Sequence, residues 1–291
     1  MKMRFNYIVF ILSAFILSLS FSCKKDDKDT RNIIAVSVEP QRKILESIAG
    51  NLFKVVTVMP SGDNPETFEP SPLRRVEIEN SDIYFSLGLL PFEQTLSKSL
   101  GEKTKVVNVS EGINLIYDTH THGEGSRAHT HRVADPHVWT SVINARRLAE
   151  NMAESLIEHD PDNGPIYKEN LSKYIARLDS LDKEFRKKIS DSSAKSFLVW
   201  HPSLSYFARD YDLDQIAVSS DTKEMSVSSI ASVIEKARNE NAGIMFYQKE
   251  FDNRQAETIS KNIGARLVRI NPVEYDWENE LSIIVDELTR Q

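Results

Sequence analysis

The sequence predicts an α/β protein of two lobes, each with a parallel sheet flanked by helices, joined by one long backbone helix. Short apolar runs alternate with segments of helical periodicity in both halves of the chain, which is typical of parallel strands connected by helices. An uninterrupted amphipathic segment separates the halves. The chain has 291 residues, of which 40% are hydrophobic, so it can bury a sizeable core and form two lobes.

Short apolar runs carry the strand prediction. In the first half of the chain they read "NIIAVSV", "FKVVTVM", "DIYFSLG" and "TKVVNVS", and in the second half "SFLVW", "QIAVSS", "GIMFYQ" and "ARLVRI". The intervening sequence has helical character over residues 41–49, 72–80, 92–100, 144–159, 227–240 and 253–263. Each half is therefore expected to form its own sheet.

The segment from residue 165 to residue 189 predicts the connecting helix. Its apolar residues recur mainly at steps of three and four, at Ile166, Tyr167, Leu171, Tyr174, Ile175, Leu178, Leu181, Phe185 and Ile189. No Gly or Pro interrupts the segment after Pro165, and Pro is favoured in the first turn of a helix. At 1.5 Å per residue the helix would be about 35–40 Å long. Two shorter helices are the alternative.

The N-terminus has the pattern of an export signal. Lys2 and Arg4 precede an uncharged, mostly apolar stretch over residues 7–22, which suits a signal peptide better than a membrane span of roughly 20 apolar residues. Cys23, the only cysteine, follows it directly. The stretch resembles a bacterial lipoprotein signal, so we expect lipidation at Cys23; an incidental thiol within the signal is the alternative.

These features divide the chain into expected segments. They are a signal peptide over residues 1–22, a charged lipidated tether over 23–31, an N-terminal lobe over 32–160, a linking helix over 161–192 and a C-terminal lobe over 193–291. The formal net charge is -7, which argues against a nucleic-acid partner because such partners favour a basic surface. We expect an exported monomer.

A histidine-rich tract lies within the N-terminal lobe, over residues 119–131. It reads "THTHGEGSRAHTH" and contains His120, His122, His129 and His131, four of the 7 histidines. The tract has no anchoring apolar residue, so we expect a flexible loop. Neutral imidazole is a common zinc ligand, and a flexible cluster of this kind can bind metal weakly. The alternative is a polar insertion without a role.

Four further residues lie at turns where ligands bind in α/β proteins. His201 follows the apolar strand "SFLVW", and Asn271 follows "ARLVRI"; His137 directly precedes a predicted helix. Glu66 lies in a loop fixed by prolines after "FKVVTVM". Because ligands bind outside the carboxyl ends of parallel strands, we expect these residues near one site. For either histidine alone, a hydrogen-bonded turn residue is an equal alternative.

Four stretches together resemble one protein family, and they occur in the family's order. They are "GDNPETFEPSP", "DPHVWTS", "HPSLSYFARDYDL" and "INPVEYDW". The chain resembles the substrate-binding proteins of ABC transporters for zinc and manganese, the ZnuA/TroA-type receptors with a helical backbone. The resemblance implies a long helix between the lobes and, in zinc-selective members, a histidine-rich loop before the second motif. It also carries a family-level link to cell adhesion.

The resemblance implies a metal site with two departures from the family pattern. His137 and His201 match the family's second and third ligands, whereas Glu66 stands where the family has histidine and Asn271 where it usually has aspartate. The expected ligands are therefore Glu66, His137 and His201, with Asn271 as a weak ligand or one acting through water. Two imidazoles and a carboxylate form a known zinc site. Gln248 is a further neutral oxygen, and loss of the site is the alternative.

The preferred function is a receptor that captures Zn²⁺ and delivers it to an ABC permease in the inner membrane. Such a receptor would be periplasmic or at the cell surface, held by a lipid anchor at Cys23. Glu66 favours Mn²⁺ slightly, whereas the histidine tract favours Zn²⁺. Alternatives are a manganese receptor, a scavenger without a permease, and a zinc hydrolase. The chain lacks HExxH and has no obvious spare general base, which disfavours the hydrolase.

Overall fold

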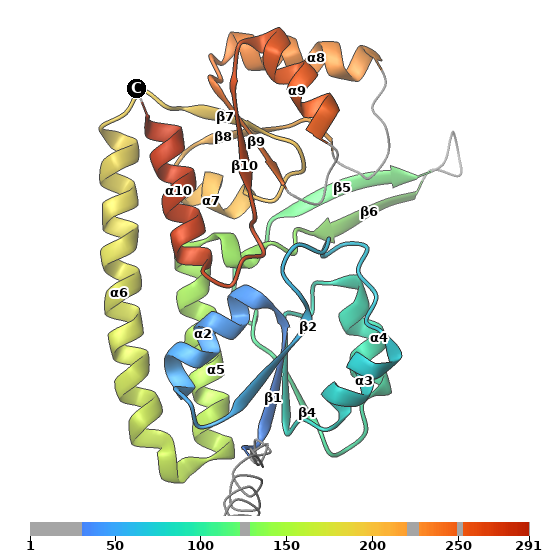
Figure 1. The fold of residues 1–291 in the computed structure, drawn as a ribbon, viewed down its shortest axis with the longest axis vertical. Helices are drawn as coiled ribbons and strands as arrows, with labels where there is room; N and C mark the ends of the chain where they lie inside the picture. The colour runs from blue at the N-terminus through green and yellow to red at the C-terminus, as the bar shows by residue number, and fades with distance from the viewer. Residues whose placement is uncertain (1–30, 123–128, 220–226, 249–252, 291) are drawn as a thin grey trace, which may run out of the picture. The chain divides into compact units, whose positions relative to one another are not determined.

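Each half of the chain folds around a parallel four-stranded sheet (Figure 1). A computed structural model describes residues 31–122, 129–219, 227–248 and 253–290. The first sheet has the order β2-β1-β3-β4, from β1 (Ile33–Val38), β2 (Lys54–Met59), β3 (Ile83–Ser86) and β4 (Lys105–Asn108). The second has the order β10-β9-β7-β8, from β7 (Ser196–Val199), β8 (Asp214–Ala217), β9 (Ile244–Gln248) and β10 (Arg266–Ile270). The α/β prediction with two lobes is confirmed.

Helices flank both sheets. They are α2 (Glu39–Ala49), α3 (Pro72–Glu79), α4 (Pro91–Ser99), α5 (Val142–His159), α7 (Ser205–Asp210), α8 (Val227–Asn239), α9 (Asn253–Ile263) and α10 (Trp277–Thr289), with short 3₁₀ turns η2 (Val138–Thr140) and η3 (Pro161–Asn163). Helices α7 and α10 are not in the sequence prediction. The six residues of α7 are too few for a helical period to be read, and α10 begins within a stretch assigned to a loop motif.

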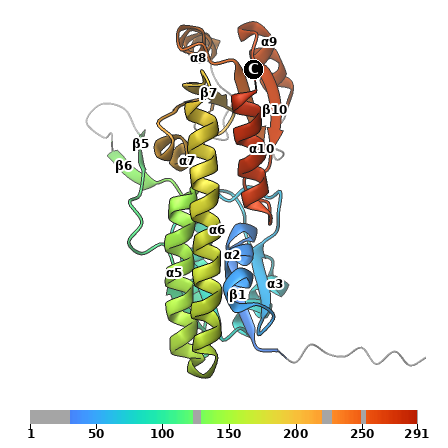
Figure 2. The same ribbon diagram turned by 90° about the vertical axis from the view of Figure 1, so that its left-hand side faces the viewer.

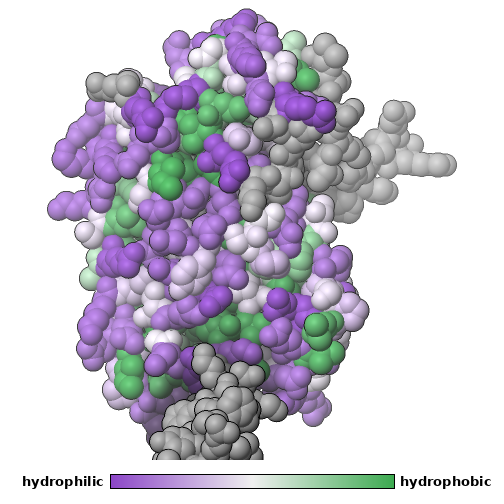
Figure 3. All heavy atoms as spheres, in the orientation of Figure 1, coloured by the Kyte–Doolittle hydropathy of each residue, from purple (hydrophilic) through white to green (hydrophobic). Residues whose placement is uncertain are grey.

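The central strands of both sheets are buried on both faces, which explains their continuous apolar sequences. Every residue of β3 and β7 is buried, as are the last five residues of β1. Parallel strands covered by helices on both sides have this composition rather than an alternation of polar and apolar residues. The face of the molecule seen in Figure 3 is mostly hydrophilic, with hydrophobic residues in small separate areas.

Helix α6 (Gly164–Ser190) joins the two halves as one continuous helix of 27 residues. At 1.5 Å per residue it is about 40 Å long, and Pro165 lies in its first turn. It packs against α2 and α5 along one part and against α10 along another (Figure 2). Glu278 of α10 accepts a hydrogen bond from the Tyr174 hydroxyl (3.1 Å) and pairs with Arg177 (2.6 Å). The prediction of one long helix is confirmed.

The two lobes share a hydrophobic core. One cluster of buried residues extends from the first sheet through the inward faces of α5, α6 and α10 to one face of the second sheet; it includes Ile34, Leu148, Leu178, Phe197 and Ile284. A second, smaller cluster covers the other face of the second sheet, around Leu198 and Met245. Because the main cluster contains side chains of both lobes, their relative movement would disturb packed apolar contacts.

The loop between β10 and α10 also fixes the C-terminal lobe on the N-terminal lobe. The Tyr275 hydroxyl donates to Glu46 of α2 at 2.7 Å. The cationic groups of Arg42 and Lys43 lie 5.5 and 5.1 Å from the centre of the Tyr275 ring, within the range of cation–π attraction. In the same loop, Glu274 accepts a hydrogen bond from Ser61, which follows β2 (3.2 Å).

The histidine tract lies partly in a β-hairpin rather than in a flexible loop. Strands β5 (Tyr117–His122) and β6 (His129–Ala134) pair antiparallel, with His120 opposite His131 and His122 opposite His129. Threonine alternates with histidine through these strands, and β-branched residues favour extended backbone, which explains the difference from the prediction. Residues 123–128 of the tract are outside the described residues.

The predicted signal peptide and Cys23 are also outside the described residues. Within residues 31–290, apart from the gaps given above, no helix has the length and the apolar composition needed to cross a bilayer.

We expect zinc, the metal that the sequence predicts, to change the relative position of the lobes very little. A shared core and a continuous helix resist the hinge bending that occurs where extended strands join two domains. The radius of gyration from solution scattering should therefore be nearly the same with and without zinc. A clear compaction on addition of zinc would contradict this expectation.

Candidate metal centre

Three of the residues that the sequence predicts as metal ligands converge in space. Donor atoms of Glu66, His137 and His201 all lie within 4.8 Å of one another. The His201 Nε2 atom lies 3.2 Å from a carboxylate oxygen of Glu66, and the two imidazole rings are 5.4 Å apart at an angle of 67°. Among the described residues, no other group of histidine, cysteine and acidic side chains meets this criterion.

One donor separation in this cluster is close to that of two ligands on a single zinc ion. Zinc in proteins is mostly tetrahedral, with bonds to nitrogen and oxygen of about 2.0–2.2 Å, so two of its ligand atoms lie about 3.3 Å apart. The separation of 3.2 Å between His201 and Glu66 already has this value. A cation would also replace the direct contact between the imidazole and the carboxylate with two stronger bonds.

Glu66 is placed by its own loop, which follows β2. Asn64 accepts a hydrogen bond from the Glu66 amide through its side chain (2.9 Å) and from the Phe68 amide through its carbonyl (3.0 Å). The Phe68 ring packs edge-on against Phe92 of α4, with 5.4 Å between ring centres, and Pro65 is buried. An Asx turn with an apolar anchor on one side therefore presents the carboxylate.

His137 is oriented by Asp135, two residues earlier in the chain. The Asp135 carboxylate accepts hydrogen bonds from both the Nδ1–H (2.8 Å) and the backbone amide (2.9 Å) of His137. This contact engages Nδ1, so we expect Nε2 to be the ligating nitrogen, in the manner of carboxylate–histidine–zinc sites. The motif "DPH" contains this signal, but the sequence prediction gave Asp135 no role.

His201 lies just beyond the carboxyl end of β7 and is 6% exposed. In the second sheet β7 has β8 on one side and β9 on the other. The order in which strands are added to the sheet therefore reverses between β7 and β9. Ligands of open α/β sheets bind at such a switch point. The position of His201 follows from this topology.

Asn271 lies just beyond the carboxyl end of β10, and its side chain is hydrogen-bonded to neighbouring residues. Its side-chain NH₂ donates to Ser61 (2.9 Å) and to Glu274 (2.8 Å). These bonds orient the amide, and its oxygen is buried without a hydrogen-bond partner among the described residues. The next residue, Pro272, accepts a hydrogen bond from the Trp139 indole (2.8 Å), which ties this loop to the segment of His137.

The centre contains two carboxylates, of which Asp135 is buried and Glu66 is partly exposed. Burial raises the pKa of Glu66, but the hydrogen bond and charge of His201 and the charge of His137 outweigh it and leave the pKa below its ordinary value. Burial also raises the pKa of Asp135, which is lowered overall by the charge and hydrogen bonds of His137. Both groups are therefore ionised at neutral pH, and a divalent cation between the histidines would be attracted by both.

The group of three donors does not include the other residues that the sequence analysis considered. His120, His122, His129 and His131 lie in the hairpin strands, and their metal binding stays a prediction. The Gln248 side chain lies next to His201, but its amide is hydrogen-bonded to the residues 201 and 203. Both its oxygen and its nitrogen are therefore used in hydrogen bonds within the protein.

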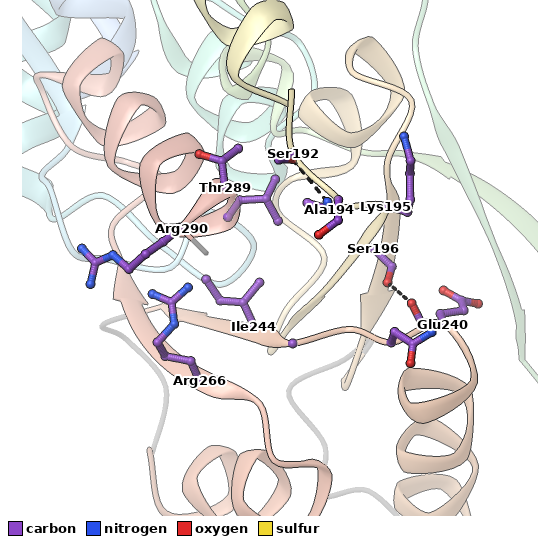
Figure 4. A pocket seen from close by; sticks show the side chains of 13 residues that line it. Ser192, Ala194, Lys195, Ser196, Glu240, Ile244, Arg266, Thr289 and Arg290 are labelled. Atoms are coloured by element: carbon purple, nitrogen blue, oxygen red, sulfur yellow. Dashed lines mark hydrogen bonds between the residues drawn. The ribbon is translucent and has the colours of Figure 1, made fainter. Parts of the chain in front are cut away.

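A separate cavity of about 350 Å³ lies at the opposite end of the second sheet (Figure 4). Ser196, Ile244 and Arg266 line it, and these residues begin β7, β9 and β10. Arg266 and Arg290 extend from one side of it (Figure 4), and both pair with Glu287. Since ligands of α/β sheets bind at carboxyl ends, we assign the candidate site to the cluster of Glu66, His137 and His201.

Two sheets joined by a long helix, with two histidines and a glutamate converging between them, define a metal-binding substrate receptor with a helical backbone. Residues 34–284 match the family described as "Zinc-uptake complex component A periplasmic", and the chain belongs to this ZnuA family. The protein is thus a receptor of a zinc-uptake family and not an enzyme.

Individual relatives agree with this assignment. The "High-affinity zinc uptake system protein ZnuA" of Bacillus subtilis (strain 168) is 28% identical over 273 residues, which cover 91% of this chain and 86% of that protein. The "Zinc-binding lipoprotein AdcA" of Streptococcus pneumoniae (strain ATCC BAA-255 / R6) is 28% identical over 250 residues, 83% of this chain, but these span only 50% of AdcA. A crystal structure of ZnuA superposes with a TM-score of 0.79 at 30% identity, covering 89% and 98% of the two chains.

We expect Asp135→Asn to weaken zinc binding about 10- to 100-fold, the usual effect of removing a carboxylate behind a ligating histidine. The amide keeps the size of the side chain but removes its charge and allows the other imidazole tautomer. Affinity is measured by competition with a chelator at fixed pH. Asp63→Asn, which changes an exposed carboxylate in the Glu66 loop, is the matched control and should bind like the parent. Parent-like zinc binding by Asp135→Asn would show that the assigned role is wrong.

Proposed function

We propose that this protein captures Zn²⁺ between its two lobes and passes it to an ABC permease in the inner membrane. Glu66, His137 and His201 supply three ligands, and Asn271 supplies a weak fourth one, directly or through a water. The observation that carries the proposal is the convergence of two imidazoles and one carboxylate within 4.8 Å. The N-terminal lobe (32–160), the linking helix (161–192) and the C-terminal lobe (193–291) are its functional parts.

Zinc is preferred over manganese because of the balance of donor types. Imidazole nitrogen suits zinc, whereas manganese takes mainly carboxylate, carbonyl and water oxygens. The candidate centre has two imidazoles and one directly available carboxylate, since Asp135 is engaged by His137. Mn²⁺ remains the second candidate, because an oxygen ligand from Glu66 replaces the family's imidazole.

The proposal includes a membrane anchor and a monomeric state. A lipid on Cys23 would hold the receptor at a membrane surface, periplasmic or exposed, by the tether over residues 23–31. The relative AdcA of Streptococcus pneumoniae is a zinc-binding lipoprotein, which supports this proposal. One chain contains all of the proposed ligands, so metal binding requires no second copy.

The histidine hairpin is proposed as an auxiliary metal site. Its backbone register sets His120 opposite His131 and His122 opposite His129, so the four histidines form two cross-strand pairs. Such pairs suit weak zinc binding. Each pair offers neutral imidazole nitrogens as donors, but no carboxylate adds negative charge to strengthen the binding. The hairpin would then raise the local concentration of zinc without forming part of the main centre.

The function is tested by metal analysis of protein purified without added metal, followed by competition between Zn²⁺ and Mn²⁺. We expect zinc to be retained and to displace manganese. His137→Ala and His201→Ala should each weaken zinc binding by orders of magnitude, since each removes one of about four donors. The exposed His159→Ala is the matched control and should bind zinc normally. Normal binding by both ligand variants would refute the site, and preference for manganese would refute the proposed cargo.

Glu66 should contribute more to zinc affinity than Asn271. Glu66→Gln removes the only charge among the direct ligands, whereas Asn271→Ala removes a neutral oxygen. The double variant Glu66→His with Asn271→Asp restores the usual family ligands and the same formal charge, so it should bind nearly as well as the parent. Glu66→His alone leaves neutral ligands and should bind less well. If Asn271→Ala weakens binding more than Glu66→Gln, the charge of Glu66 is not what the site depends on.

Replacing the four hairpin histidines with serine should leave one tight zinc site and abolish only weaker ones. Serine keeps the strands polar, so the pairing of β5 and β6 is retained. A calorimetric titration separates the two classes of sites by their stoichiometry. Loss of the tight site in this variant would show that the hairpin provides a primary ligand.

A further inference from the structure

The turn that carries His201 is held by a glutamine at the end of the neighbouring strand. Gln248 is the last residue of β9 and is 1% exposed. Its oxygen accepts a hydrogen bond from the His201 backbone amide (3.3 Å), and its nitrogen donates to the His201 carbonyl (2.7 Å). The same nitrogen lies 2.6 Å from the Ser203 hydroxyl.

This side chain continues the sheet where the backbone of β7 leaves it. The ladder between β7 and β9 pairs Val199 with Phe246, and the Trp200 amide donates to the Phe246 carbonyl at 2.8 Å. At the next residue, His201, the side-chain amide of Gln248 takes the place of a backbone peptide group. It accepts a hydrogen bond from the His201 N–H and donates one to the His201 carbonyl. These two bonds hold the His201 backbone beside the end of β9, although Pro202 follows it and the strand β7 has ended.

A second glutamine holds the following residues from the other side. Gln215 of β8 accepts a hydrogen bond from the Leu204 amide (2.9 Å) and donates to the Ser205 hydroxyl (2.9 Å). The loop after β7 is therefore secured by side-chain amides from both neighbouring strands. Gln248 bonds to both backbone groups of His201, and the Ser203 backbone amide also donates to the His201 carbonyl (2.7 Å).

We propose that Gln248 is a positioning residue for metal binding, which acts by fixing the backbone of His201. This inference rests on the proposed function and gives Gln248 a role other than that of a ligand oxygen. His201 must reach the ion from the C-terminal lobe, whereas Glu66 and His137 reach it from the N-terminal lobe. A fixed turn sets the direction of its Nε2 atom before the metal arrives, so binding does not require the turn to become ordered. The neutral amide does this without adding charge to the centre.

The test compares Gln248→Met with Gln215→Met. Methionine has a similar length but cannot form these hydrogen bonds, so each variant removes one amide from the same loop. Zinc affinity is measured by chelator competition, thermal stability by calorimetry, and ligand geometry by the visible absorption spectrum of the Co²⁺-loaded protein. We expect Gln248→Met to bind zinc about 10- to 100-fold more weakly, in the range usual for residues that orient metal ligands, with an altered Co²⁺ spectrum.

Gln215→Met should lose comparable stability but keep nearly the parent's affinity and spectrum, because it leaves the His201 backbone contacts in place. Equal affinity losses in the two variants, or a parent-like spectrum in Gln248→Met, would overturn the inference. If Gln248→Met does not fold, Gln248→Glu retains the volume and the acceptor for the His201 amide but loses both donated bonds. It should then bind zinc more weakly than the parent, and parent-like binding would overturn the inference. Failure of the parent to bind zinc would refute the proposed function instead.

Discussion

The metal centre depends on a fixed distance between two lobes. Glu66 and His137 extend from the N-terminal lobe and His201 from the C-terminal lobe, yet their donor atoms lie within 4.8 Å. A shift of about 1 Å between the lobes would separate donors that must lie about 3.3 Å apart on one ion. The shared core and α6 oppose such a shift, because both lobes pack against the same helices.

Two carboxylates lie at the junction where the three donor groups meet. Glu66 and Asp135 are carboxylates held near two imidazoles, and the pKa of each carboxyl lies below its ordinary value. A divalent cation between the histidines would balance the combined charge of the two carboxylates. Asp135 acts behind His137 rather than as a direct donor. It thereby strengthens the imidazole as a ligand while leaving the number of direct donors small.

Neutral amides orient the segments around this charge. Asn64 fixes the Glu66 loop, Gln248 the His201 turn, and Asn271 is itself oriented by Ser61 and Glu274. Amides can accept and donate at once, so they satisfy backbone groups that leave the regular ladder. They do so without the desolvation that a further buried charge would require. The loops at the centre are consequently ordered although they lie outside helices and strands.

The sequence by itself determined the strands, the long helix and the residues that meet at the site. Strands buried on both faces and an uninterrupted helical period are local patterns, and His201 follows directly from the end of a strand. The tertiary structure alone decided which side chains support these ligands. Gln248 is separated from His201 by 47 residues and Ser61 from Asn271 by 210, so no spacing in the chain signals their contact. The pairing of the histidine strands likewise depends on register, which is set when two segments meet rather than by the composition of either one.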